Sequence, residues 1–189
     1  MVKSILLVGV GGQGTILISK ILSAGFVKMG FDVKMSEIHG MSQRGGSVTT
    51  QIRYGEKVYS PSIGLGEADV IVSFETVEAL RALPYLKQGG RLITDTYEIY
   101  SMPVLTGAAE YPSDAIDAIR ETGANVTVIE AMAEAQKLGN SRVQNIVLLG
   151  ALTKVLGLEG IDWEEVVASL VPPKTIELNR QAYRVGNSK

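Results

Sequence analysis

The sequence predicts an α/β fold that is Rossmann-like and doubly wound, with a mostly parallel sheet, an inserted hairpin and a helical C-terminal extension. Apolar runs of strand length alternate with segments of helical period as far as Ile129, which is typical of this class. The first strand ends in a glycine cluster that opens a helix, and the chain after Asn140 is helical throughout. With 189 residues, 46% of them apolar, the chain is long enough to bury the core of one domain. We therefore expect a single domain over 1–189, with a helical C-terminal part over 140–189.

The first strand and its turn occupy Ile5 to Gly14. Gly9, Gly11 and Gly14 have the spacing of the dinucleotide-binding fingerprint, in which missing β-carbons let a phosphate approach backbone N–H groups. The start of the next helix adds unpaired N–H groups and a positive dipole end. On these residues alone two interpretations stay open, an anion site and a turn that only serves packing. The candidate cofactor-binding residues are Gly9, Gly11, Gly12, Gln13 and Gly14.

A helix and a second strand follow this turn. Apolar residues recur at steps of three and four from Ile18 to Met29, which predicts a helix that ends near Gly30 and lies on the sheet. Phe31 to Glu37 is then expected to form a strand parallel to the first, reached by a right-handed crossover. Glu37 lies near its end, where nucleotide-binding folds often carry the acid that accepts a ribose hydroxyl. This position is the main argument for a nucleotide.

The stretch from His39 to Ser47 has neither helical nor strand period, and its small and polar residues include one cation, Arg44. We interpret it as a functional loop, because irregular loops rich in polar residues tend to carry function. A plain turn into the next strand is the alternative, for which Gly45 and Gly46 would suffice. His39 decides nothing by itself, since a single histidine is more often structural. The candidate substrate or partner-site residues are Glu37, His39, Met41, Ser42, Gln43, Arg44, Gly45, Gly46 and Ser47.

The middle of the chain contains the predicted hairpin and further strands and helices. Ser47 to Arg53 and Lys57 to Tyr59 flank a turn, so these two strands are expected to pair with each other. Asp69 to Phe74 is a buried strand that leads into a helix with an acidic first turn, Glu75 to Leu86. The other predicted elements are a turn at Lys87 to Gly90, a strand from Arg91 to Asp95, an irregular stretch from Tyr97 to Pro112, a helix from Ser113 to Glu121 capped by Ser113, a strand from Asn125 to Ile129 and a helix from Ala131 to Lys137.

The last third of the chain predicts three helices. Asn140 is a suitable cap for a helix from Ser141 to Leu156, whose apolar residues leave little polar surface, so this helix is expected in the core or in a subunit interface. Asp162 begins a capping box for the helix Trp163 to Leu170. Thr175 to Tyr183 forms a polar terminal helix, and the last two helices together resemble a docking appendage.

Composition excludes several classes of function. Eighteen Lys and Arg against 20 Asp and Glu give a net charge of −2, so neither DNA nor RNA is expected as a partner. The chain has no cysteine, and therefore no disulfide, thiolate nucleophile or cysteine-ligated cluster, and we expect no metal site. Val143 to Leu158 is too short and too polar for a membrane span. Because Met1 to Ser4 lacks the features of a secretory signal, we expect a cytoplasmic protein that needs no membrane.

Three stretches together resemble the gamma-type domain of the 2-oxoacid:ferredoxin oxidoreductases. They are Gly9 to Gly14, Ser36 to Val48, and Pro61 to Leu80 with its Gly66 to Asp69 segment. The resemblance covers at least Val2 to Gly157. Within this family, the loop from His39 to Gly46 is most similar to the beta-subunit type that serves indolepyruvate.

The resemblance implies a subunit of an enzyme that oxidatively decarboxylates arylpyruvates, passing electrons to ferredoxin and the acyl group to coenzyme A. In this family thiamine diphosphate and the iron–sulfur clusters are carried by the larger alpha subunit, so this chain would be inactive alone and would contribute no catalytic residue. Gly11 to Gly14 would offer N–H groups, and Gln13 its amide, to a phosphate of coenzyme A or to the partner. Arg44 would hold a phosphate or carboxylate, or pair with Glu37 and fix the loop.

Two other interpretations compete with the subunit. A stand-alone NAD(P)- or flavin-binding reductase of Rossmann type is supported by Gly9, Gly11, Gly14 and Glu37. A non-catalytic scaffold would use the glycine turn for packing and the helix after Asn140 for assembly. That helix also predicts that the isolated chain either forms a homodimer or needs its partner for full stability.

Overall fold

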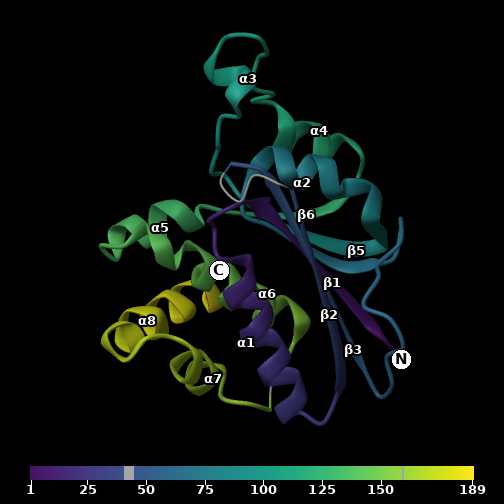
Figure 1. Cartoon of the computed structure of the whole chain (residues 1–189), viewed down its shortest axis with the longest axis vertical. Coiled ribbons are helices and arrows are strands. Elements are labelled where there is room, and N and C mark those ends of the chain that lie inside the picture. The colour runs from purple at the N-terminus through teal and green to yellow at the C-terminus, as the bar shows by residue number, and fades with distance from the viewer. Residues whose placement is uncertain (41–44, 159) are drawn as a thin grey trace.

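The computed structural model, which describes residues 1–40, 45–158 and 160–189, is built around a six-stranded sheet with the strand order β2-β3-β1-β4-β5-β6 (Figure 1). Five strands run in one direction, because β1, β4, β5 and β6 pair in parallel and β3 is antiparallel to both β1 and β2. The strands are β1 (Lys3–Val10), β2 (Asp32–His39), β3 (Ser47–Gly55), β4 (Ala68–Ser73), β5 (Leu86–Asp95) and β6 (Asn125–Ile129). The prediction of an α/β, mostly parallel sheet is confirmed.

Helices cover both faces of this sheet. Two buried clusters lie on opposite faces, a large one beneath α1, α5, α6, α7 and α8 and a smaller one beneath α2 and α4 (Figure 1). The helices are α1 (Thr15–Lys28), α2 (Thr76–Ala82), α3 (Met102–Leu105), α4 (Ala115–Glu121), α5 (Ala131–Lys137), α6 (Gln144–Leu156), α7 (Trp163–Leu170) and α8 (Ile176–Asn187), with 3-10 turns at Leu83–Tyr85, Ser141–Val143 and Pro173–Thr175. None of the helices in the described ranges is long and apolar enough to cross a membrane.

The predicted hairpin is wrong in its pairing. Lys57 to Tyr59 is not a strand; instead β2 pairs along its full length with β3, from Asp32 opposite Gly55 to His39 opposite Val48. Because β1 occupies the other edge of β3, the backbone of β3 has no free edge for a third partner. The second strand therefore has the predicted direction, but β3 lies between it and β1.

Two smaller predictions fail for local reasons. Lys87 to Gly90 is not a turn but the irregular start of β5, where the register with β4 shifts between Ala68 and Val70. Helix α4 begins after Asp114 without any side-chain cap, so Ser113 does not cap it. By contrast, Asp162 accepts a hydrogen bond from Glu165 N at 3.1 Å and caps α7 as predicted. Asn140 accepts one from Arg142 N at 3.0 Å, but it caps the 3-10 turn Ser141–Val143, and α6 itself begins at Gln144 without a side-chain cap.

The C-terminal helices belong to the core and are not an appendage. The first ten residues of α6 are all buried, which accounts for its apolar surface within this chain. Trp163 of α7 and Tyr183 of α8 lie in the same large cluster as α6. The Tyr183 hydroxyl also lies 2.8 Å from Thr153 Oγ1. A β-carbon at Gly186 would come within 1.8 Å of Val147 O, so α8 packs backbone to backbone against α6.

We predict that Gly186→Ala destabilises the protein by about 1–3 kcal/mol, because the new methyl group overpacks the contact with Val147. The direction of the change in stability is informative, because Gly→Ala within an exposed helix usually stabilises a protein by about 1 kcal/mol. The measurement is urea denaturation of both proteins. Gly40→Ala, whose β-carbon would meet nothing within 4 Å, is the control and should leave the midpoint unchanged. A Gly186→Ala protein as stable as the wild type would contradict the packing described here.

Candidate functional site

The carboxyl ends of β1, β4, β5 and β6 meet at one edge of the sheet, hereafter the carboxyl edge. The chain leaves β1 toward α1 on one face and leaves β4 toward α2 on the opposite face. The gap between β1 and β4 is therefore a topological switch point, where open α/β sheets bind their ligands. The glycine turn after β1 and the segment Phe74 to Thr76 lie at this point.

The glycines of the turn after β1 differ in their surroundings: some pack against other side chains and one is exposed. A β-carbon at Gly9 would lie 2.8 Å from Gln13 Oε1, and one at Gly14 would lie 2.3 Å from Asn145 Nδ2, so both positions need glycine for packing. Gly12, in contrast, is exposed, and a β-carbon there would meet nothing within 4 Å. Its φ of +103° lies in a region that other residues rarely adopt, so the backbone conformation, and not packing, favours glycine here. Packing therefore accounts for Gly9 and contributes at Gly14, whose φ of +80° also favours glycine, whereas the anion site stays a prediction.

The start of helix α1 has no side-chain cap among the described residues. Gly14 precedes the helix in a left-handed conformation. Thr15 and Ile16 are in the first turn of α1, where backbone N–H groups have no acceptor within the helix. The helix dipole is positive at this end. Gly11 N donates to Gly46 O at 2.9 Å, which ties the turn to the end of the loop before β3. The geometry suits an anion at the start of α1.

Gln13 has an internal role. Its Oε1 accepts from Val10 N at 2.7 Å, and its Nε2 donates to Phe74 O at 2.7 Å and lies 3.5 Å from Gln144 Oε1. The amide thus joins the ends of β1 and β4 to helix α6. The expectation that this amide donates to a phosphate does not fit, because its polar atoms already have partners inside the protein.

Gln144 extends this network to a buried carboxyl group. Its Nε2 donates to Phe74 O at 3.0 Å and to Asp95 Oδ2 at 2.6 Å. Asp95, at the end of β5, also accepts from the backbone N–H groups of Ala131 and Met132 at the start of α5. Burial raises the pKa of Asp95 above its ordinary value, although these donors oppose the shift. Sequence reasoning treated Asp95 only as the end of a strand.

A cavity of about 340 Å³ brings part of the predicted site together. Glu37 and His39 at the end of β2 face the glycine turn and the first residues of α1 across it. Within the described ranges, Glu37 Oε1 is buried and accepts no hydrogen bond. Backbone N–H donors therefore lie on one side of the cavity and a carboxylate acceptor lies on the other. This arrangement suits a ligand that has both a phosphate and a hydroxyl group. Its lining residues are Gly11, Gly12, Gly14, Thr15, Ile16, Glu37, His39 and Val48.

The remaining residues of the predicted loop do not join this cavity. Ser47 lies on the other face of the sheet, where its hydroxyl donates to Glu78 Oε2 at 2.6 Å. Gly45 and Ser47 line a separate cavity of about 290 Å³ beside α2. Met41, Ser42, Gln43 and Arg44 lie outside the described residues, and so do both uses foreseen for Arg44. Across the described ranges, no group of three or more His, Asp and Glu residues is arranged to hold a metal ion.

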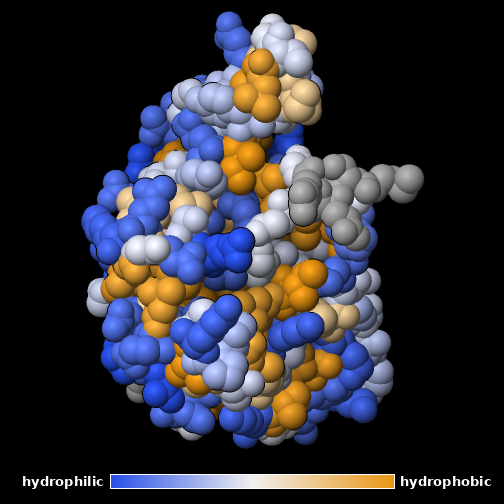
Figure 2. Space-filling view, turned by 60° about the vertical axis from the view of Figure 1, so that its left-hand side comes forward, coloured by the Kyte–Doolittle hydropathy of each residue, from blue (hydrophilic) through white to orange (hydrophobic). Residues whose placement is uncertain are grey.

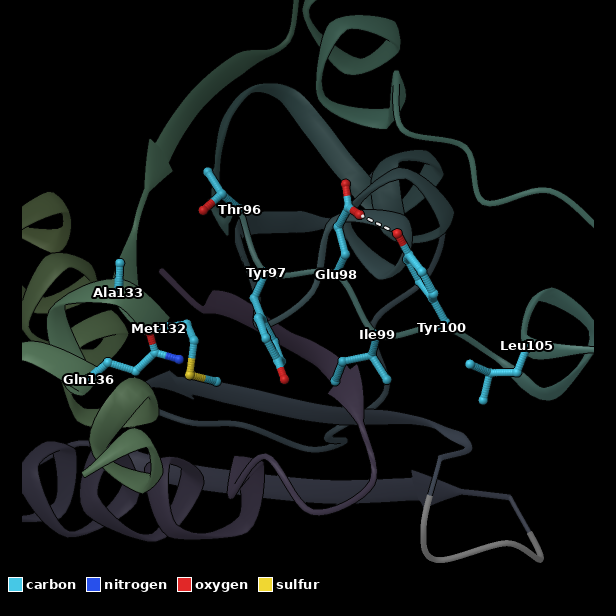
Figure 3. Close-up of a pocket in the computed structure, with 9 residues that line it drawn as sticks. All are labelled: Thr96, Tyr97, Glu98, Ile99, Tyr100, Leu105, Met132, Ala133 and Gln136. Atoms are coloured by element: carbon cyan, nitrogen blue, oxygen red, sulfur yellow. Dashed lines mark hydrogen bonds between the residues drawn. The ribbon is translucent and has the colours of Figure 1, made fainter. Parts of the chain in front are cut away.

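The segment after β5 forms a third cavity, of about 660 Å³, that sequence reasoning missed. Figure 3 shows its lining, which comes from residues 96–105 on one side and from α5 on the other. Tyr97, Ile99 and Met132 contribute apolar surface, and the Tyr100 hydroxyl donates to Glu98 Oε2 at 3.4 Å. The available signal was the two tyrosines beside apolar residues in a stretch without regular period.

Comparisons with known proteins agree with the fold and extend over the whole chain. The family model described as "Pyruvate ferredoxin/flavodoxin oxidoreductase" matches residues 4–188. The chain is 41% identical to indolepyruvate oxidoreductase subunit IorB of Thermococcus kodakarensis and 42% identical to that of Pyrococcus horikoshii, covering 97% of this chain and 93% of each relative. Among solved structures, the gamma subunit of a keto/oxoacid ferredoxin oxidoreductase from Geobacter sulfurreducens matches with a TM-score of 0.72 and 24% identity, covering 98% of this chain and 96% of that chain.

We predict that Gln13→Leu lowers the free energy of unfolding by about 1–3 kcal/mol, because Val10 N loses its buried acceptor. A residue that only served a ligand would change binding without this loss. The measurement is urea denaturation of the purified chain. Gln136→Leu is the matched control, since Gln136 is exposed on α5, and it should shift stability by no more than about 0.5 kcal/mol. Equal stability of Gln13→Leu and the wild type would show that the network does not depend on Gln13.

Proposed function

The chain belongs to the pyruvate ferredoxin/flavodoxin oxidoreductase family, and we propose that it is the cluster-free subunit of an indolepyruvate:ferredoxin oxidoreductase. The observation that carries this is the identity of 41% and 42% to IorB subunits, which extends over 97% of the chain. The complex would convert an arylpyruvate, coenzyme A and oxidised ferredoxin into an acyl-coenzyme A, carbon dioxide and reduced ferredoxin.

The chemistry of this reaction belongs to groups that we assign to a larger alpha subunit. Thiamine diphosphate supplies the electron sink for decarboxylation, and iron–sulfur clusters carry the electrons toward ferredoxin. This chain has no cysteine to ligate a cluster. What it offers is a rigid carboxyl edge with backbone donors, a carboxylate and three cavities. We therefore assign it the binding and positioning of ligands, with the larger subunit completing the site.

We also propose that the cavity at the start of α1 receives coenzyme A. Its N–H donors at Thr15 and Ile16 suit a phosphate, and Glu37 suits a hydroxyl group on the same ligand. The described lining contains no Lys or Arg, so the phosphate would depend on the helix dipole and backbone N–H groups. The same features also suit NAD(P) or a flavin nucleotide, which is why the stand-alone reductase remains the second candidate function.

Co-expression with a thiamine- and cluster-bearing larger subunit tests the first proposal. We expect purification through a tag on this chain to yield a complex that reduces ferredoxin or viologen only when indolepyruvate and coenzyme A are both present. The isolated chain should show no such activity, because the proposal assigns the redox centres to the larger subunit. A chain that ignores the larger subunit, and instead binds NAD(P) or flavin with a saturable isotherm, would favour the reductase.

Ile16→Glu tests the anion site. Ile16 is exposed in the first turn of α1, where a carboxylate suits the helix dipole but competes with a bound phosphate. We expect the KM for coenzyme A in the assembled complex to rise about fivefold, corresponding to about 1 kcal/mol. Stability should stay equal or increase. Ile16→Gln, which has the same length but no charge, is the control, and equal KM values for the two variants would contradict a phosphate at this helix.

A further inference from the structure

The connection between β5 and α4 projects from the body of the molecule. We call residues 97–112, which include α3, the projecting arm. Figure 1 shows α3 at the tip of this arm, beyond the layers of helices and the sheet. Nearly all residues of the arm are exposed, and only Ile99, Val104 and Tyr111 are half-buried. The arm therefore contributes almost nothing to either core cluster, and long connections with so little regular structure usually have a function.

The arm is nevertheless held at both ends by one buried residue. Glu75, 1% exposed, accepts hydrogen bonds from Ile99 N at 3.2 Å and from the Tyr111 hydroxyl, while its other oxygen caps α2 through Glu78 N. Thr76 N also donates to Tyr97 O at 3.2 Å. Burial and the Glu75 carboxylate raise the pKa of Tyr111, so the phenol stays protonated and remains a donor. The position of the arm is thus set before any partner binds.

The arm exposes several large apolar or aromatic side chains. Met102 is 68% exposed and Leu105 64%, and Tyr97 and Tyr100 are also exposed beside the cavity of about 660 Å³ (Figure 3). Ile16 and Ile38 add further exposed apolar side chains at the carboxyl edge. Figure 2 shows apolar surface on the projecting part of the molecule and on the body below it. Tyrosines beside a pocket, with large apolar side chains around them, are typical of binding hot spots.

The charge of the arm indicates what kind of surface it fits. Between Arg91 and Arg120 the sequence contains no Lys, Arg or His, whereas Glu98, Glu110 and Asp114 are exposed. An acidic surface without neighbouring cations is complemented by a surface that carries positive charge. The surface that fits the arm is therefore apolar with a basic rim.

We propose that the projecting arm is the docking surface for the larger subunit, and this inference rests on the proposed function. The arm borders the same carboxyl edge as the candidate ligand site, so a chain that covers the arm also approaches the cavity at α1. An apolar side chain of the larger subunit would enter the cavity beside Tyr97, and basic side chains would face Glu98 and Glu110. Tight contact at the tip would come from Met102 and Leu105.

The test compares two variants in binding to the purified larger subunit by titration calorimetry. Met102→Asp combined with Leu105→Asp should weaken the affinity at least tenfold, because it places two charges in an apolar contact. Leu65→Asp is the matched control: Leu65 is 70% exposed but precedes β4, at the opposite edge of the sheet, and the variant should bind like the wild type. All three proteins should unfold at the same temperature, since the substituted side chains are exposed.

Each outcome decides the assignment. Wild-type affinity in the double variant, or an equal loss in Leu65→Asp, would overturn it. A wild-type chain that dimerises in light scattering, and a double variant that does not, would assign the arm to a second copy instead. A wild-type chain that binds no larger subunit would overturn the proposed function and the docking surface together, whereas binding that the double variant retains would overturn the docking surface alone.

Discussion

The carbonyl oxygen of Phe74 joins the elements that form the carboxyl edge of the sheet. It accepts hydrogen bonds from both Gln13 and Gln144, and Gln144 passes a second hydrogen bond to Asp95. These contacts join the ends of three neighbouring strands to α6, and Asp95 in turn caps α5. Gln144 and Asp95 are buried, so each of their hydrogen bonds left unmade would cost about 1–3 kcal/mol. The network therefore sets the spacing of the carboxyl edge more strictly than apolar packing alone would do.

The cavities of this edge follow from that spacing. The glycine turn is held from below by Gln13, so the start of α1 presents its donors toward Glu37 at the end of β2. On the other face, Glu75 follows Phe74 directly and ties the projecting arm to α2. The end of β4 thus positions two different surfaces, the cavity at the start of α1 and the projecting arm. One of them is polar and suits an anion, and the other is apolar and acidic and suits a protein.

Local pattern predicted the elements well, because strand and helix periods are properties of short segments. The strand Asp69 to Phe74 and the helix before Gly30 are examples. The partner of β3 could not be predicted in this way, since Lys57 to Tyr59 is adjacent in sequence but β2 forms the longer ladder. The roles of Gln13 and Asp95 could not be predicted from local pattern either. Their hydrogen-bond partners lie far away in sequence, and a glutamine in a glycine turn resembles a ligand residue until Phe74 O and Gln144 are placed beside it.

The arrangement also fits the role that we propose for the chain as one subunit of a larger complex. Reactive intermediates of 2-oxoacid chemistry require a site from which water is excluded. Here the cavities open to solvent at the carboxyl edge, and the apolar side chains of the arm are exposed at the same edge. A second chain that covers the arm would bury this apolar surface and shield the adjacent cavities in one step. Under the proposed function, assembly and the completion of the site would then be driven by the same contact.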